Sequence, residues 1–143
     1  MNVYVDTSAL AKWYVNEAMS EEVEAYLREA CPVSISLLTK VEMRSLIARR
    51  VREGHIDSET QVRIMATFEG DIALGHLVLV RHTVESFLIA ESLLGAQPEI
   101  PLAALDAIHL GVMRAASLGA VATADRVMAR AAGVLGMECH PFF

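Results

Sequence analysis

Short apolar, β-branched segments alternate with longer segments of helical character along the whole chain. Strands are predicted at residues 3–5, 33–36, 77–80, 120–122 and 138–140. Helices are predicted between them, over residues 8–15, 21–30, 39–53, 58–74, 83–95, 103–118 and 125–132. Strands that alternate with helices pair in parallel through crossover connections. We therefore expect an α/β domain, a three-layer α/β/α sandwich with a mostly parallel sheet.

Hydroxyl and glycine residues mark where several of these helices are expected to begin or end. Ser20 is predicted as the N-cap of the helix at 21–30. Thr83 is predicted to cap the helix at 83–95, which Gly95 is predicted to end. Two further helix starts match the capping-box pattern, with Thr39 paired to Glu42 and Ser58 paired to Gln61.

The length and composition predict one domain that is unusually rich in apolar residues. A chain of 143 residues fits a single domain, residues 1–143, with a sizeable core. Apolar residues make up 54% of the chain, and the mean hydropathy is +0.39. This surplus predicts a sheet covered on both faces and also a subunit interface. The net charge of −6 gives no general basic field, so nucleic acid would need clustered basic residues or cations.

The location of the protein follows from its cysteines and its apolar segments. Cys31 and Cys139 form no CxxC motif, so a reducing compartment is expected. The N-terminal MNVYVDTS enters a strand pattern and has no cationic, apolar signal. The most hydrophobic long stretch, residues 102–124, contains Asp106, His109 and Arg114, which argues against a membrane span. We expect a soluble, cytoplasmic protein.

Two aspartates stand where predicted strands end. Asp6 follows the strand at 3–5, and Asp125 comes just after the strand at 120–122. Both are candidate site residues, because ligand sites in such sheets lie at the carboxyl ends of the strands. Each also fits the role of N-cap for the helix that follows. Two aspartates on one sheet edge would repel each other, which favours a cation beside them.

Asp106 and Glu42 are the other acidic candidates. On a helix, Asp106 shares a mostly apolar face with Leu102 and Leu110, where a carboxylate is costly unless it is paired or bound to a metal. A nearby arginine would satisfy it equally well. Glu42 fits either a metal site or a purely structural role as the capping-box partner of Thr39.

Four carboxylates from separate segments can converge only around an oxygen-preferring dication. Mg²⁺ is usually held by a few carboxylates and keeps several waters, which leaves room for a phosphate oxygen. Such an ion activates water and screens the charge that builds up on a phosphate. The pattern therefore predicts a Mg²⁺ site, at which Mn²⁺ can substitute, that activates water next to a phosphate.

Four sequence blocks carry a family resemblance: VYVDTSALAKWY, VEMRSLIARR, LDAIHLGVMRAASLGA and VATADRVM. In this order and spacing they resemble the motifs of PIN-domain proteins, in particular the VapC-type toxins of toxin–antitoxin pairs. The match covers nearly the whole chain. The resemblance implies an acidic quartet that holds the metal of a ribonuclease, namely Asp6, Glu42, Asp106 and Asp125. It places supporting hydroxyls at Thr7, Ser8 and Thr123.

The same resemblance implies partners as well as a site. These are an RNA substrate, a second copy of the chain in a homodimer, and a small antitoxin protein that blocks the active site. Gly111 departs from the pattern, because alanine is commoner in the family at that position. We expect this departure to be tolerated.

Basic residues and a histidine near the acidic blocks add further candidates. Arg44, Arg49 and Arg50 lie together on the predicted helix at 39–53 and are candidate contacts for RNA phosphates. A solvated helix face that pairs with acids is the alternative for them. His109 follows Asp106 by one helical turn, and we favour a packed supporting role for it over that of a base.

Two other functions compete with the ribonuclease. A PIN-like scaffold would bind RNA or protein without catalysis, although the intact quartet argues against it. A phosphoacceptor switch domain also places acids around Mg²⁺ at strand ends. Such domains carry an adjacent acidic pair near the first strand and a lysine near the site. Here Thr7 follows Asp6, and no lysine occurs after Lys40.

Overall fold

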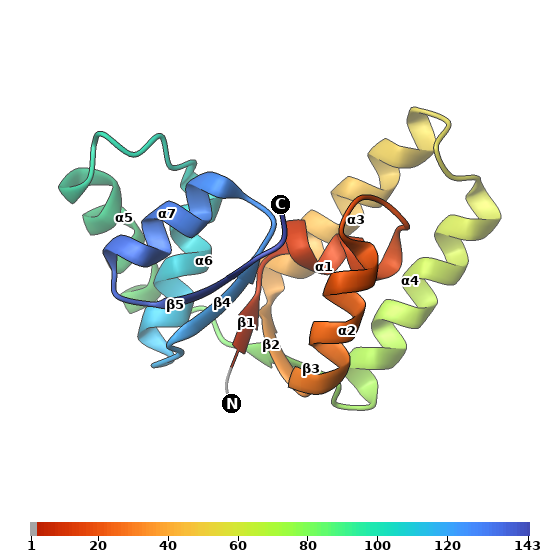
Figure 1. The fold of residues 1–143 in the computed structure, drawn as a ribbon, viewed down its shortest axis with the longest axis horizontal. Helices are drawn as coiled ribbons and strands as arrows, with labels where there is room; N and C mark the ends of the chain where they lie inside the picture. Colours follow the sequence, from red (N-terminus) through yellow and green to blue (C-terminus); the bar gives the residue numbers. More distant parts are fainter. Residues whose placement is uncertain (1–2) are drawn as a thin grey trace.

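The computed structural model describes residues 3–143, so Met1 and Asn2 of the predicted domain lie outside the described residues. Every predicted strand is present, and all of them join one parallel sheet (Figure 1). The strands are β1 (Val3–Val5), β2 (Val33–Ser36), β3 (Leu77–Val80), β4 (Ala120–Thr123) and β5 (Glu138–Pro141). The expected α/β class is therefore confirmed, and the sheet is parallel throughout its five strands.

The order of strands in the sheet is β3-β2-β1-β4-β5. The chain builds outward from β1 to β3 on one side and then returns to add β4 and β5 on the other. A crevice forms where the order reverses, outside the carboxyl ends of β1 and β4. Flavodoxin-like phosphoacceptor domains have the order 2-1-3-4-5 instead. The topology therefore argues against the phosphoacceptor alternative.

Seven helices in residues 3–143 complete the three layers (Figure 1). The helices α1 (Thr7–Tyr14), α2 (Ser20–Ala30), α3 (Leu37–Arg52) and α4 (Ser58–Ala73) cover one face. The opposite face carries α5 (Val84–Ala96), α6 (Ala104–Ala115) and α7 (Arg126–Val134). None of the helices in the described part of the chain is long and apolar enough to cross a membrane.

Alternate residues of the central strands supply the two cores. Val3 and Val5 of β1 pack toward α1–α4, whereas Tyr4 between them packs toward α6 and α7. In β4, Ala122 packs toward α1–α4, and Val121 packs toward α6 and α7. A strand buried on both faces reads as a continuous apolar run, which explains why β1 and β4 were recognisable from the sequence.

The helix starts differ from the sequence prediction in detail. Ser20 lies inside α2 and does not cap it, because its hydroxyl accepts a hydrogen bond from the backbone of Glu17 at 2.9 Å. The cap of α4 is Asp57, which accepts from the backbone nitrogen of Thr60 at 2.7 Å, so the predicted box of Ser58 with Gln61 is wrong. The capping box of α3 pairs Ser36 with Thr39, one turn before the predicted pair.

Two helix ends also differ from the prediction. Gly95 lies within α5, which continues to Ala96. Helix α6 ends at Ala115, earlier than predicted, and Ser117 then takes a positive φ of 57°. The cap of α5 by Thr83 is confirmed, since its hydroxyl accepts from the backbone nitrogen of Ser86 at 3.2 Å.

Helix α6 approaches α5 closely at Gly111. A Cβ atom at this position would lie 2.1 Å from the carbonyl oxygen of Ser86 and 3.3 Å from the backbone nitrogen of Ala90. Backbone atoms cannot yield as a flexible side chain can, so the helix pair admits only glycine here. The departure from the commoner alanine therefore has a packing cause, in keeping with the expectation that glycine is tolerated here.

Gly111→Ala is expected to destabilise the protein by about 1–3 kcal/mol or more, because α6 must move away from α5. Gly70→Ala is the matched control, since Gly70 is also helical and a Cβ there meets nothing within 4 Å. The free energy of unfolding of that control should rise by about 0.5–1 kcal/mol, because alanine reduces the entropy of the unfolded chain. Urea unfolding of both variants measures the difference, and equal midpoints would contradict the close approach.

Candidate active site

An open pocket of about 330 Å³ lies beyond the carboxyl ends of β1 and β4. Side chains from α1, α3, α6 and the segment between β4 and α7 form its wall. The pocket brings together all four acids that the sequence singled out. It is lined by Asp6, Thr7, Ser8, Glu42, Ser45, Leu46, Arg49, Leu105, Asp106, His109 and Asp125.

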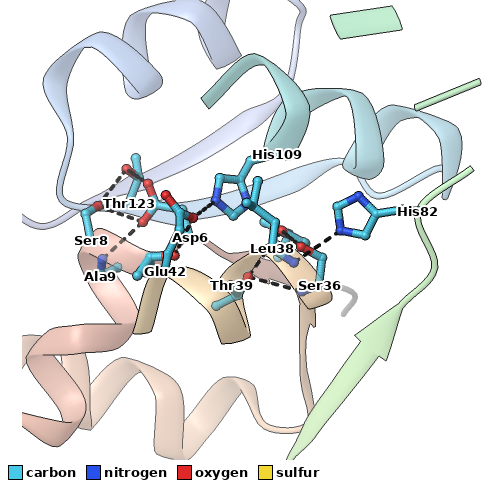
Figure 2. Close-up of polar contacts among 12 residues, drawn as sticks. Asp6, Ser8, Ala9, Ser36, Leu38, Thr39, Glu42, His82, His109 and Thr123 are labelled. Carbon is cyan, nitrogen blue, oxygen red and sulfur yellow. Dashed lines mark hydrogen bonds and ion pairs between the residues drawn. The ribbon is translucent and has the colours of Figure 1, made fainter. Parts of the chain in front are cut away.

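Asp6 is at once a helix cap and a pocket residue. It is 3% exposed and forms the N-cap of α1, where its Oδ1 accepts from the backbone nitrogen of Ala9 at 3.0 Å. Ser8 donates to the same oxygen at 2.7 Å, and Thr123 donates to Oδ2 at 2.5 Å (Figure 2). Burial raises the pKa of Asp6, although these three hydrogen bonds oppose the shift. The two roles considered for Asp6 therefore coincide.

Asp125 also combines a cap with a place in the pocket. Its Oδ1 accepts from the backbone nitrogens of Val127 at 2.7 Å and Met128 at 3.0 Å, which starts α7. Within residues 3–143, Oδ2 of Asp125 accepts no hydrogen bond. One oxygen therefore anchors the side chain, and the other is left for a ligand.

The hydroxyls of Ser8 and Thr123 connect the ends of β1 and β4. Besides donating to Asp6, Ser8 accepts from the backbone nitrogen of Ala124 at 2.9 Å. Thr123 accepts from the backbone nitrogen of Asp125 at 3.0 Å. These bonds fix the two strand-end aspartates relative to each other, which is what a supporting hydroxyl is expected to do.

Asp106 is the acid with the fewest protein partners. It lies half-buried in the first turn of α6, and no arginine or other donor among residues 3–143 bonds it. Burial raises its pKa to about 6, and the negative charges of Asp125, Asp6 and Glu42 add to the shift. The charges of all four acids therefore act on one another within the pocket.

This shift predicts how the metal-free protein responds to pH. The folded-state pKa of about 6 lies above the ordinary 3.8, so Asp106 stabilises the fold below about pH 4. That contribution is lost as the pH rises through about 6. In EDTA, Asp106→Asn should therefore lose less thermal stability than the wild type between about pH 4 and about pH 7. Calorimetry measures this, and parallel pH profiles would contradict the shift.

Glu42 reaches the pocket from α3, and its side chain is 23% exposed. Its Oε1 accepts from the hydroxyl of Thr7 at 2.8 Å and from Nε2 of His109. Burial alone would raise the pKa of Glu42, but these two hydrogen bonds and the charge of His109 lower it overall. The capping role predicted with Thr39 is wrong, because α3 starts earlier and Thr39 bonds the backbone nitrogen of Ser36 at 3.1 Å.

His109 belongs to a buried polar network that sequence reasoning only partly anticipated. It is 1% exposed, as expected for a packed supporting residue, and its Nδ1 lies 2.6 Å from the hydroxyl of Tyr4. Tyr4 in turn donates to Ser36 at 2.9 Å. Burial raises the pKa of Tyr4 to about 12, so the phenol remains neutral. The network joins residues from β1, β2 and α6, which lie far apart in the sequence.

The three candidate arginines differ in their surroundings. Arg49 is exposed and lines the pocket. Arg50 forms an ion pair with Glu17 at 2.8 Å, so its guanidinium is engaged within the protein. Arg44 is exposed on the same helix but does not line the pocket. The pocket geometry therefore favours Arg49 among them as a contact for a phosphate.

The donor set of the pocket fits a hydrated magnesium ion. Its candidate ligands are carboxylate oxygens, which Mg²⁺ prefers, and several of these oxygens have no protein donor. In residues 3–143, no group of three or more acidic, histidine or cysteine side chains has the arrangement of a metal site. Mg²⁺ is usually bound through one or two carboxylates and keeps several waters, so it does not need such a group.

Comparisons with known proteins give matches that span nearly the whole chain. Residues 3–134 match the model of the PIN domain family. Ribonuclease VapC46 of Mycobacterium tuberculosis (strain ATCC 25618 / H37Rv) is 34% identical over 138 residues, which cover 94% of this chain and 93% of that protein.

Solved structures show the same fold. The sarcin-ricin loop cleaving toxin VapC20 of Mycobacterium tuberculosis superposes with a TM-score of 0.72 at 20% identity, covering 94% of this chain and 95% of that one. FitAcB from Neisseria gonorrhoeae superposes with a TM-score of 0.72 at 19% identity, covering 97% of this chain and 96% of that one. A chain of VapBC2 from Rickettsia felis, bound to a promoter DNA fragment, gives 0.70 at 11% identity over 100% of both chains. Because the family model covers residues 3–134 and the VapC46 relative matches over nearly its whole length, the chain belongs to the PIN domain family.

Proposed function

We propose that this chain is a divalent-metal-dependent endoribonuclease and the toxin of a toxin–antitoxin pair. The observation that carries the proposal is the pocket in which carboxylates from four separate segments meet. The mutual repulsion of these carboxylates favours the binding of a cation between them. The relation to a protein named as a ribonuclease supports RNA as the substrate.

Asp106, Glu42, Asp125 and Asp6 would hold Mg²⁺ or Mn²⁺ in the pocket. When bound, such an ion lowers the pKa of water and screens negative charge on a phosphate. Glu42 and Asp125 each keep one oxygen without a protein donor, and Asp106 keeps both. Asp6 accepts bonds at both oxygens, but a carboxylate oxygen has a second lone pair for a further ligand.

The substrate is proposed to enter with a phosphodiester group facing the acids and Arg49. The guanidinium of Arg49 would bind a phosphate oxygen and offset the acidic surroundings. Arg44 extends the positive charge of α3, whereas Arg50 is held by Glu17. The bonds from Ser8, Thr7 and Thr123 hold the acids in place before the RNA arrives.

The ends of the cut RNA test the proposal. A water that attacks phosphorus in line leaves a 5′-phosphate on one fragment and a 3′-hydroxyl on the other. We expect these ends, and we expect a single 2′-deoxy nucleotide at the scissile position to permit the chemical step. Mass mapping of end-labelled products measures both. Cyclic 2′,3′-phosphate ends would contradict the proposal, because they require attack by the neighbouring 2′-hydroxyl.

We further propose a cytoplasmic homodimer that binds a small antitoxin. Large apolar side chains are exposed in the first turns of α3 and α5. These are 51–77% exposed and comprise Leu37, Val41, Val84, Phe87 and Leu88. Exposed apolar side chains of this kind support a subunit interface. The free thiols of Cys31 and Cys139 are consistent with a reducing compartment, and the VapBC2 complex supports an antitoxin partner.

A further inference from the structure

The geometry points to His109 and Thr7 as positioning residues that clamp one oxygen of Glu42 and thereby present the other to the pocket. Both residues donate to Oε1, Thr7 at 2.8 Å. Among residues 3–143, Oε2 of Glu42 has no hydrogen-bond partner. This inference rests on the proposed function, because it treats Oε2 as a ligand for the metal ion.

The imidazole of His109 is itself held by a hydrogen bond at its other ring nitrogen. Its Nδ1 meets the hydroxyl of Tyr4 at 2.6 Å, and Tyr4 is fixed to Ser36 at the end of β2. Because both ring nitrogens have partners, rotation of the ring, which is 1% exposed, would break two hydrogen bonds. Nε2 is therefore kept directed at Glu42, in the manner of a buried residue that orients a metal ligand (Figure 2).

Glu42 needs such a clamp more than the other acids do. Asp6 and Asp125 are short side chains that backbone N–H groups already fix at helix starts. Glu42 is longer, lies inside α3 and is 23% exposed, so an unclamped side chain would sample several rotamers. Holding Oε1 leaves one arrangement, and a preorganised ligand binds a metal more tightly than a mobile one.

A matched pair of amide substitutions tests the clamp. The amide nitrogen of glutamine reaches the position of Nε2, whereas that of asparagine reaches only the position of Nδ1. His109→Asn should therefore weaken Mn²⁺ binding by about 10–100-fold, and His109→Gln should retain most of the affinity. Electron paramagnetic resonance of free Mn²⁺ measures the affinity without any RNA. Equal affinities for the two variants, whether both normal or both weak, would overturn the inference.

Two further variants separate a clamp from general damage to the fold. In a Glu42→Gln background, His109→Asn should cause little additional loss, because the ligand that it positions is already gone. A full additional loss would show that His109 does not act through Glu42. Thr7→Val removes the other donor with little change in volume and should also weaken Mn²⁺ binding. If it leaves the affinity unchanged, the clamp is wrong even where His109→Asn fails to fold.

The same measurements distinguish this inference from the proposed function. If the wild type and Glu42→Gln show no difference in Mn²⁺ binding, the metal site itself is misplaced and both proposals fail. If Glu42→Gln weakens binding but His109→Asn does not, only the clamp fails. The expected pattern is a loss for Glu42→Gln, His109→Asn and Thr7→Val, with His109→Gln close to the wild type.

Discussion

Asp106→Asn should cleave RNA at least about a hundredfold more slowly than the wild type, while the protein stays folded. Asparagine has nearly the same shape but removes one negative charge from the proposed metal site. A metal ion supplies several kcal/mol of charge stabilisation, and each 1.4 kcal/mol changes the rate about tenfold. Asp106 accepts no hydrogen bond from described residues, so its replacement breaks no structural contact.

The control for this substitution is Asp57→Asn. Asp57 is an exposed N-cap of α4 that does not line the pocket, and asparagine caps helices equally well. It removes the same charge from the surface, so its cleavage rate should match the wild type. The two variants are compared by their cleavage rates at saturating Mg²⁺ and by their melting temperatures in EDTA. If Asp106→Asn retains wild-type activity, Asp106 is not part of the catalytic pocket.

Removal of divalent metal should abolish cleavage, again by at least about a hundredfold. Without a cation, an approaching phosphate meets the repulsion of four carboxylates in one pocket. Activity should return with Mg²⁺ or Mn²⁺. Calcium should bind and support little turnover, because its larger and looser shell positions water poorly.

Chelation must act on the site and not on the fold for this result to be meaningful. Asp6 and Asp125 keep their protein donors without metal, so the melting temperature in EDTA should show a folded protein. Cleavage rates are then compared in EDTA, in EDTA followed by excess Mg²⁺, and in Ca²⁺. Full activity in EDTA would contradict the acidic quartet and point to a metal-free mechanism.

The sequence was sufficient for the strands of the sheet and for the acids that follow strands or lie on an apolar helix face, whereas Glu42 was singled out by the family resemblance. The strands β1 and β4 are buried on both faces, which makes them apolar runs with sharp ends at Asp6 and Thr123. An acid directly after such a run lies at the functional edge. Asp106 was conspicuous because its helix face is otherwise apolar.

Glu42 and its partners could not be placed from local patterns. Ser36 with Thr39 and Thr39 with Glu42 are overlapping capping motifs one turn apart, and the choice depends on where β2 ends. The contact between Tyr4 and His109 joins residues separated by 105 positions. Only the packing of α6 against β1 brings them together, so no window of sequence contains the signal.

Three helices begin at the acidic pocket, and this has an electrostatic consequence. Asp6 caps α1, Asp125 caps α7, and Asp106 lies in the first turn of α6. Each helix start carries a partial positive charge of roughly half an elementary charge from its unpaired N–H groups. The backbone thus offsets part of the repulsion that the carboxylates create. The folded protein can therefore hold its acids together without an ion, and the proposed metal would complete a charge balance that the helices have already begun.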